Sequence, residues 1–156
     1  MVASAALFIC LLCIPIESLH SQQMSTSPAG DWRTFGDRGE RPRALVHLTE
    51  EGGTLTGTLV ESLVPGEELS GICDKCSGSR KDMPMAGLEF LTGLKSRGEG
   101  EYRDGEILDP ETGKTYRCTV KMIGTNKLLV RGYLGVSLLG RSQEWERIEA
   151  KSATTN

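Results

Sequence analysis

The sequence predicts one all-β domain, a single antiparallel β-barrel of about eight strands. Three observations support this fold class. Short apolar stretches follow one another with period-two alternation rather than helical spacing. The 156 residues include 19 glycines, without a collagen-like period, which indicates many turns between short strands. A series of hairpins without intervening helices must protect its edge strands, and closure into a barrel is the economical solution for a chain of this length.

An N-terminal signal peptide is expected before this domain. Residues 5–16 are apolar and too short to span a bilayer comfortably, and the small or polar residues Ser18 and Ser21 follow them. We expect cleavage between Ser18 and Gln22, and export to the periplasm or the extracellular space. The alternative is an apolar N-terminal helix packed in the core. The expected organisation is a signal peptide over residues 1–21, a flexible linker over 22–29, the barrel domain over 30–149 and a disordered tail over 150–156.

The first strands are predicted from alternation and turn chemistry. The clearest hairpin joins residues 44–49 to residues 55–61 through the turn Glu50–Gly53. Residues 62–83 mix Pro, Gly, Ser and charge, which is typical of a long loop. The apolar stretch that begins at Pro84 is compatible with a strand or a short helix, and we favour a strand.

A second hairpin is predicted around the turn Asp109–Gly113. This turn starts with an Asp whose carboxylate can cap it, has a Pro where φ is already near its turn value, and ends with a Gly that tolerates positive φ. Residues 115–123 follow with clean alternation of side chains, so one face of this strand should pack in the core and the other should contact water. Residues 128–147 are then expected to form two strands that turn a tight corner.

Several pieces of the chain form an ordered set of motifs. They are Gly30-Asp31-Trp32, Cys73-Asp74-Lys75-Cys76, Asp109-Pro110, Gly113-Lys114-Thr115-Tyr116, Arg131-Gly132-Tyr133-Leu134-Gly135 and Trp145-Glu146-Arg147. This set resembles the exported bacterial family catalogued as domain of unknown function 2147. The resemblance covers residues 30–148, and its C-terminal half is the most specific part. It implies a small calycin-like or lipocalin-like barrel in the cell envelope, and it implies no established activity.

The pair Trp32 and Arg147 is similar to the lipocalin arrangement, in which a late Arg covers a Trp of the first strand. An Arg guanidinium can lie over an indole and donate hydrogen bonds to nearby carbonyls, which contributes about 0.5–2 kcal/mol. We therefore expect this pair to close one end of the barrel and to be structural.

Three cysteines remain once the signal peptide is removed: Cys73, Cys76 and Cys118. In an oxidising compartment we expect one disulfide, either between Cys73 and Cys76 or between Cys118 and one of these two. A redox role would need the CxxC pair at a helix N-terminus within a βαβ unit, and this context is missing. A zinc site would need all three cysteines together with His47. One CxxC is too little to predict a metal, so neither a metal nor a cofactor is expected.

Charge and composition exclude other function classes. The net charge of −3 and the pI of about 5.5 leave no excess of cations for a nucleic-acid backbone. His47 is the only histidine certain to survive processing, and we expect it on the outer face of a strand. Turn formation and solvation explain the clustered carboxylates, so no catalytic residue is predicted and the protein is expected not to be an enzyme. These carboxylates are Asp104, Glu106, Asp109 and Glu111.

Two functions remain open. The one we favour from sequence is binding of a small apolar ligand, because a barrel of about eight strands is just wide enough to hold one. The second is a structural or protein-interaction module of the cell envelope, with a filled barrel and with loops 33–43 and 62–83 as contact surfaces. No transmembrane segment is expected after signal cleavage. The candidate ligand-lining residues are Val46, Leu48, Leu55, Leu59, Tyr116, Val120, Met122 and Val130.

Overall fold

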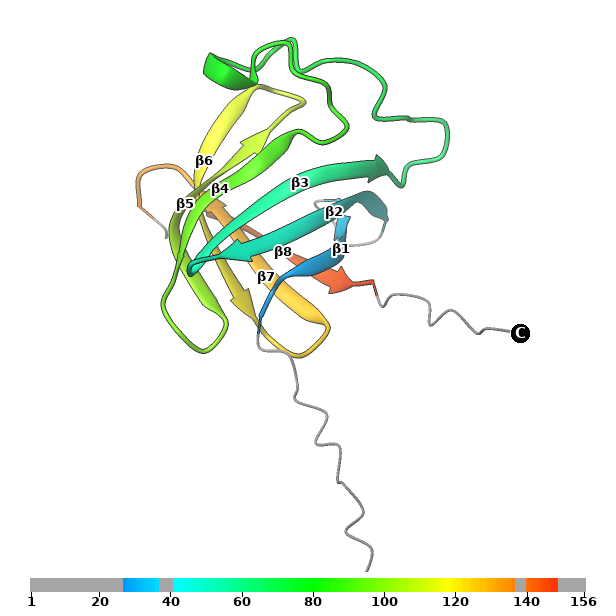
Figure 1. The fold of residues 1–156 in the computed structure, drawn as a ribbon. Coiled ribbons are helices and arrows are strands. Elements are labelled where there is room, and N and C mark those ends of the chain that lie inside the picture. Colours follow the sequence, from blue (N-terminus) through cyan, green and yellow to red (C-terminus); the bar gives the residue numbers. More distant parts are fainter. Residues whose placement is uncertain (1–26, 37–40, 137–139, 149–156) are drawn as a thin grey trace, which may run out of the picture.

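Eight antiparallel strands form the fold (Figure 1). They are β1 (Gly30–Phe35), β2 (Pro42–Glu51), β3 (Thr54–Ser62), β4 (Glu89–Ser96), β5 (Glu101–Asp109), β6 (Lys114–Met122), β7 (Lys127–Tyr133) and β8 (Gly140–Arg147). Each strand pairs with its neighbours in chain order, and pairing of β1 with β8 closes the barrel. The structure is a computed structural model and describes residues 27–36, 41–136 and 140–148. The predicted fold class is therefore correct.

The ends of the chain mostly fall outside these ranges. The predicted signal peptide (1–21), residues 22–26 of the predicted linker and the predicted tail (150–156) lie outside the described residues and stay predictions. In the described part of the chain, no helix has the length and apolar character needed to cross a membrane.

The two predicted hairpin turns have the expected chemistry. Between β2 and β3, Gly52 and Gly53 adopt φ values of +54° and +72°, which an L side chain would disfavour. Between β5 and β6, Asp109 Oδ1 accepts a hydrogen bond from the Glu111 backbone N–H at 3.0 Å, and Gly113 has a φ of +73°. Both predictions are confirmed.

The connection between β3 and β4 is longer than predicted. The strand expected from Pro84 begins only at Glu89, and Pro84 forms an isolated bridge with Ile72. The chain turns first, because Gly87 has a φ of +81° and the Leu88 N–H bonds to the Met85 carbonyl. A single 3-10 turn, η1 (Gly78–Arg80), lies within the connection.

Two other predicted boundaries need correction. The loop expected over 33–43 is shorter, because Arg33–Phe35 belongs to β1 and Pro42–Arg43 belongs to β2, while residues 37–40 lie outside the described ranges. The last two strands are joined by residues 134–139 rather than by a tight corner.

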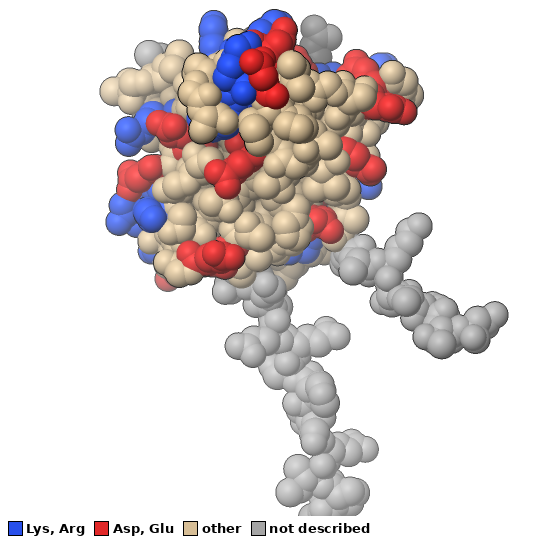
Figure 2. All heavy atoms as spheres, turned by 45° about the horizontal axis from the view of Figure 1, so that its top comes forward, with Lys and Arg blue, Asp and Glu red and all other residues tan. Residues whose placement is uncertain are grey.

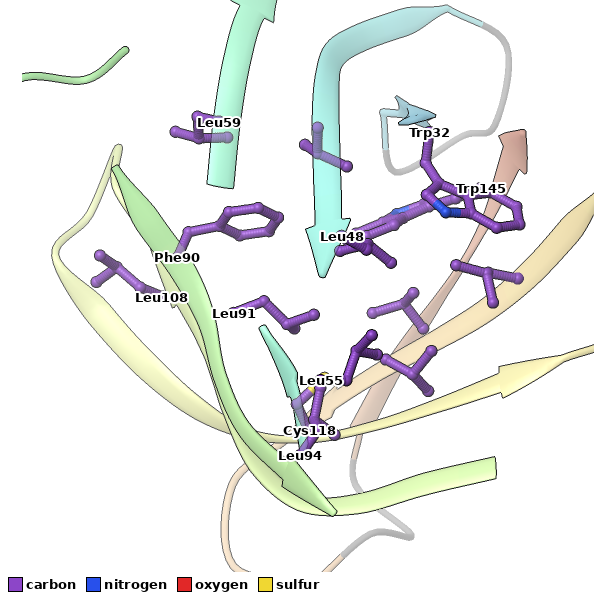
Figure 3. Packing of buried hydrophobic residues seen from close by; sticks show 14 of the residues in the cluster. Trp32, Leu48, Leu55, Leu59, Phe90, Leu91, Leu94, Leu108, Cys118 and Trp145 are labelled. Atoms are coloured by element: carbon purple, nitrogen blue, oxygen red, sulfur yellow. The ribbon is translucent and has the colours of Figure 1, made fainter. Parts of the chain in front are cut away.

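The barrel interior is filled by apolar side chains from every strand (Figure 3). Trp145 and Phe90 meet across it, with ring centroids 6.1 Å apart. Phe90 and Leu91 are consecutive and yet both buried, because the register between β3 and β4 shifts around Gly57. A Cβ at Gly57 would lie 2.6 Å from a Leu48 methyl carbon, so Gly57 permits this close approach.

The antiparallel order gives the barrel two distinct ends. The end where β1 begins and β8 finishes, with the β2–β3, β4–β5 and β6–β7 turns, is called the Trp32 end below. The opposite end carries the long connection 63–88, called the β3–β4 loop below, and the β5–β6 turn (Figure 1). It is called the loop end.

Candidate functional site

The Trp32 end is closed by an indole and a guanidinium. Trp32 is fully buried, and its Nε1 donates a hydrogen bond to the Pro28 carbonyl at 2.7 Å. The guanidinium carbon of Arg147 lies 4.3 Å from the centroid of the Trp32 ring. This stacking has the geometry of a cation–π contact.

Arg147 also binds the segment before β1. Its guanidinium donates to the carbonyls of Thr125 at 3.1 Å, Ala29 at 2.7 Å and Ser27 at 2.8 Å. Residues 27–29, assigned from sequence to the flexible linker, are therefore part of the closed barrel. Sequence reasoning missed them because their backbone carbonyls, not their side chains, make the contacts.

A buried tyrosine completes this end. Tyr102 is 3% exposed, and burial together with a hydrogen bond to the Glu50 carboxylate raises its pKa above the ordinary value. Ser27 donates to Glu50 Oε2 at 2.7 Å. Since the phenol stays neutral and hydrogen-bonded, this network stabilises the fold and offers no reactive group.

The predicted ligand-lining residues are brought together in the interior. Val46, Leu48, Leu55, Leu59, Val120 and Val130 are each at most 7% exposed, and Tyr116 and Met122 are partly buried. The six buried ones belong to one packed cluster with both tryptophans. They contact each other and their neighbours, as side chains in a filled core do.

The disulfide joins Cys73 to Cys76, which is the first of the two predicted pairings. Both cysteines are buried within the β3–β4 loop, at 1% and 4% exposure. Cys118 lies in the barrel interior as a free thiol, and burial raises its pKa to about 12. A thiol with this pKa is a poor nucleophile at neutral pH.

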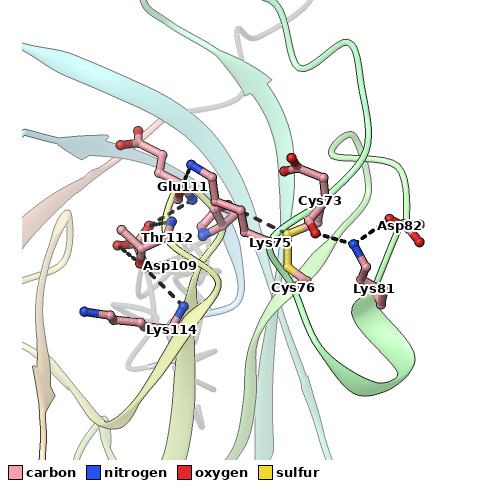
Figure 4. Close-up of a disulfide and its surroundings, with 11 residues drawn as sticks. Cys73, Lys75, Cys76, Lys81, Asp82, Asp109, Glu111, Thr112 and Lys114 are labelled. Carbon is pink, nitrogen blue, oxygen red and sulfur yellow. Dashed lines mark hydrogen bonds and ion pairs between the residues drawn. A yellow bond between two sulfur atoms is a disulfide. The ribbon is translucent and has the colours of Figure 1, made fainter.

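The β3–β4 loop is fastened to the β5–β6 turn (Figure 4). Lys75 Nζ donates to the Glu111 carbonyl at 2.8 Å, and the disulfide sulfur Sγ of Cys73 lies 3.8 Å from the Pro110 carbonyl oxygen. Gly113 is required here, because a Cβ at this position would lie 1.9 Å from the Lys75 carbonyl oxygen. The loop therefore has a fixed position on the barrel.

Two surface depressions lie outside the barrel interior. The first, of about 350 Å³, is called the β3 groove below and is lined by Val60, Glu61, Ser62, Glu67, Glu68, Leu69, Ser70 and Ala86. The second, of about 330 Å³, follows the seam between β1 and β8 and includes Phe35 and Gln143. Neither contains a predicted lining residue. The pair Glu67-Glu68 in a Pro- and Gly-containing loop was the available sequence signal for the first.

His47 lies on the outer face of β2, as expected. Its Nδ1 is 2.6 Å from Asp31 Oδ1, and both side chains are about half exposed. Among the described residues, no group of three or more His, Cys, Asp or Glu side chains is arranged to hold a metal ion.

The Arg147 contacts predict a large loss of stability when its donors are removed. Arg147→Met keeps an apolar stem over Trp32 but leaves three carbonyls without their charged donor, so we expect a loss of about 2–3 kcal/mol. Arg103→Met is the matched control, since Arg103 pairs with Glu101 on the surface and its loss should cost less than about 1 kcal/mol. Urea unfolding of both variants measures this, and equal losses would contradict a closing role.

The buried thiol predicts an alkaline loss of stability. The pKa of Cys118 rises from 9.0 to about 12 on folding, so the unfolded chain ionises first. The stabilisation is therefore complete below the unfolded pKa and declines above it, by about 1 kcal/mol between about pH 8 and pH 10. Urea unfolding across this range should show a shallower decline for Cys118→Ala than for the wild type. Parallel profiles would contradict the prediction.

Comparisons with known proteins agree with this fold. A family model described as "Uncharacterized protein conserved in bacteria (DUF2147)" matches residues 30–147. A solved structure whose title reads "Protein HP1028 from the human pathogen Helicobacter pylori belongs to the lipocalin family" matches with a TM-score of 0.68 and 18% identity. The match covers 79% of this chain and 84% of that chain. No curated protein matches the chain. With a closed lipocalin-like barrel and a family match that spans it, the chain belongs to this DUF2147 family of bacterial proteins.

Proposed function

We propose that the protein is an exported, non-enzymatic interaction module that binds an envelope partner through its loop end. The observation that carries this proposal is the filled interior. The side chains that would line a ligand cavity pack against one another, and both surface depressions lie elsewhere. Binding then has to use the outer surface of the barrel.

The β3–β4 loop supports the choice of the loop end. It is held in place by a disulfide and by its contacts with the β5–β6 turn. Even so, it exposes large apolar side chains, with Ile72 at 53% and Met83 at 48%, and Val60 near the end of β3 is exposed at 42%. An ordered loop that presents apolar side chains to solvent is typical of a protein contact surface.

The cysteines and His47 support export and the lack of an enzymatic role. A disulfide within the β3–β4 loop suits an oxidising compartment such as the periplasm. The Cys118 thiol has a raised pKa, and His47 pairs with Asp31, with both side chains about half exposed. These groups have structural explanations.

A second candidate function is binding of a small apolar ligand inside the barrel. Two observations favour it: the interior is apolar throughout, and the fold is similar to that of a protein whose title places it in the lipocalin family. Such a ligand would have to displace side chains such as Phe90 or Trp145, which now contact each other.

In vivo photo-crosslinking tests the first proposal. A photoreactive residue is placed at Ile72 on the loop end or at Ile123 near the Trp32 end, which are exposed to similar extents, 53% and 44%. We expect a discrete protein adduct from position 72 and none from position 123. No adduct from either site, together with a native mass that decreases on denaturation, would favour the small-ligand alternative instead. Adducts from both sites would contradict a specific loop-end surface.

A further inference from the structure

We propose that the β3 groove docks an extended, cationic peptide segment of the partner. This inference rests on the proposed function and names the chemistry that the loop end would recognise. In the proposed complex, a Lys or Arg side chain of the partner lies in the groove. Its apolar stem contacts the apolar lining residues, and its charged group lies among the Glu carboxylates of the groove.

The groove exists because β3 continues beyond its pairing with β4. The last register pair between these strands is Thr58 with Glu89. Leu59 extends the contact by one residue, because its N–H donates to the Leu88 carbonyl and its carbonyl accepts from the Gly87 N–H. From Val60 to Ser62, β3 pairs with β2 on one side only. The chain then bends away and returns as Glu67–Ser70, which leaves the groove between the strand edge and the loop.

The floor of the groove is apolar. Val60 is 42% exposed, Leu69 is partly buried against the core, and Ala86 also lines the groove. An exposed aliphatic residue beside a free strand edge can contact the side chains of an extended peptide, which is the geometry that strand-edge recognition uses. The volume of about 350 Å³ suits one long side chain rather than a folded element.

The walls of the groove are acidic and lack cations. Glu61, Glu67 and Glu68 are exposed, and none of them takes part in an ion pair within the described part of the chain. The cation nearest along β2, Arg43, is already bound to Glu111 of the β5–β6 turn. Figure 2 shows a broad area without charged side chains on the face that includes the loop end, bordered by both acidic and basic side chains.

The apolar and acidic lining of the β3 groove together favour a bound side chain that is both cationic and apolar. Three carboxylates near one another repel, and a cation between them relieves this repulsion. Lys and Arg combine an aliphatic stem with a charged head, so one side chain satisfies both the floor and the walls of the groove. An acidic segment would add to the repulsion, and a purely apolar one would leave the carboxylates without a partner.

Fluorescence anisotropy with synthetic peptides tests the proposal. The probe is a labelled peptide of alternating Lys and Val, and the reference is the same peptide with Glu in place of Lys. The groove variant combines Glu61→Gln, Glu67→Gln and Glu68→Gln. The matched control combines Glu51→Gln, Glu99→Gln and Glu106→Gln, three exposed carboxylates of β2, the β4–β5 turn and β5, so both variants change the net charge equally.

We expect the Lys peptide to bind the wild type and the control alike, and to bind the groove variant about tenfold more weakly. Binding should also weaken at about 0.5 M salt, since the contacts are exposed. Equal weakening in both variants would show attraction to net charge alone and overturn the proposal, as would equal binding of a neutral Val peptide or no binding of the Lys peptide. Concentration-dependent self-association lost in the groove variant would assign the groove to a second copy of the chain instead.

Crosslinking from Ile72 in the groove variant separates this inference from the proposed function. If the adduct persists while the peptide titration shows no selectivity, the groove assignment fails and the loop-end function stands. If the wild type forms no adduct from Ile72, the proposed function itself fails. If the adduct decreases in the groove variant and not in the control, both stand.

Discussion

Closure of the barrel depends on its shortest seam, between β1 and β8. Only Trp32 with Arg147 and Arg33 with Glu146 are in register there, whereas β7 and β8 pair over seven positions from Gly140 to Glu146. A seam this short provides few backbone hydrogen bonds to hold the first and last strands together. Arg147 adds contacts at this end, because it donates to three carbonyls and covers the Trp32 ring, which binds residues 27–29 to the end of the barrel. One side chain thus joins the first strand, the last strand and a turn.

The same packing that stabilises the barrel is the reason why we propose that the protein binds its partner through its outer surface. Trp145 and Phe90 occupy the centre, and apolar residues from the remaining strands surround them, so the interior acts as a core. Fold similarity to a lipocalin-family protein shows the architecture alone, because function depends on the site that a fold carries. In this protein the loop end combines order with exposed apolar and acidic groups. The β3–β4 loop is ordered there because Gly113 lets its backbone lie directly on the β5–β6 turn.

Sequence reasoning succeeded where local chemistry determines local structure. The sequence predicts the inward-facing positions Val46 and Leu48 because they recur with period two. It predicts the β5–β6 turn because the roles of Asp109 and Gly113 depend only on their immediate neighbours. The start of β4 was misplaced because Phe90 and Leu91 are both buried, which follows from a register shift against β3 and breaks the period-two pattern. Choosing between the disulfide pairings required the position of Cys118 inside the barrel, and no local pattern contains that information.

The β3 groove illustrates why a surface site of this kind is hidden in the sequence. Glu67 and Glu68 read locally as a solvated loop, and Val60 reads as one more residue of an alternating strand. They become neighbours only because β3–β4 pairing stops near Leu59 while β3 continues, which is a long-range property of the sheet. The pairing stops because the chain turns at Gly87, before β4 begins at Glu89, and residues 67–70 of the β3–β4 loop line the space that is left. A mismatch in length between two paired strands therefore creates the surface, and three carboxylates give it a preference for cations.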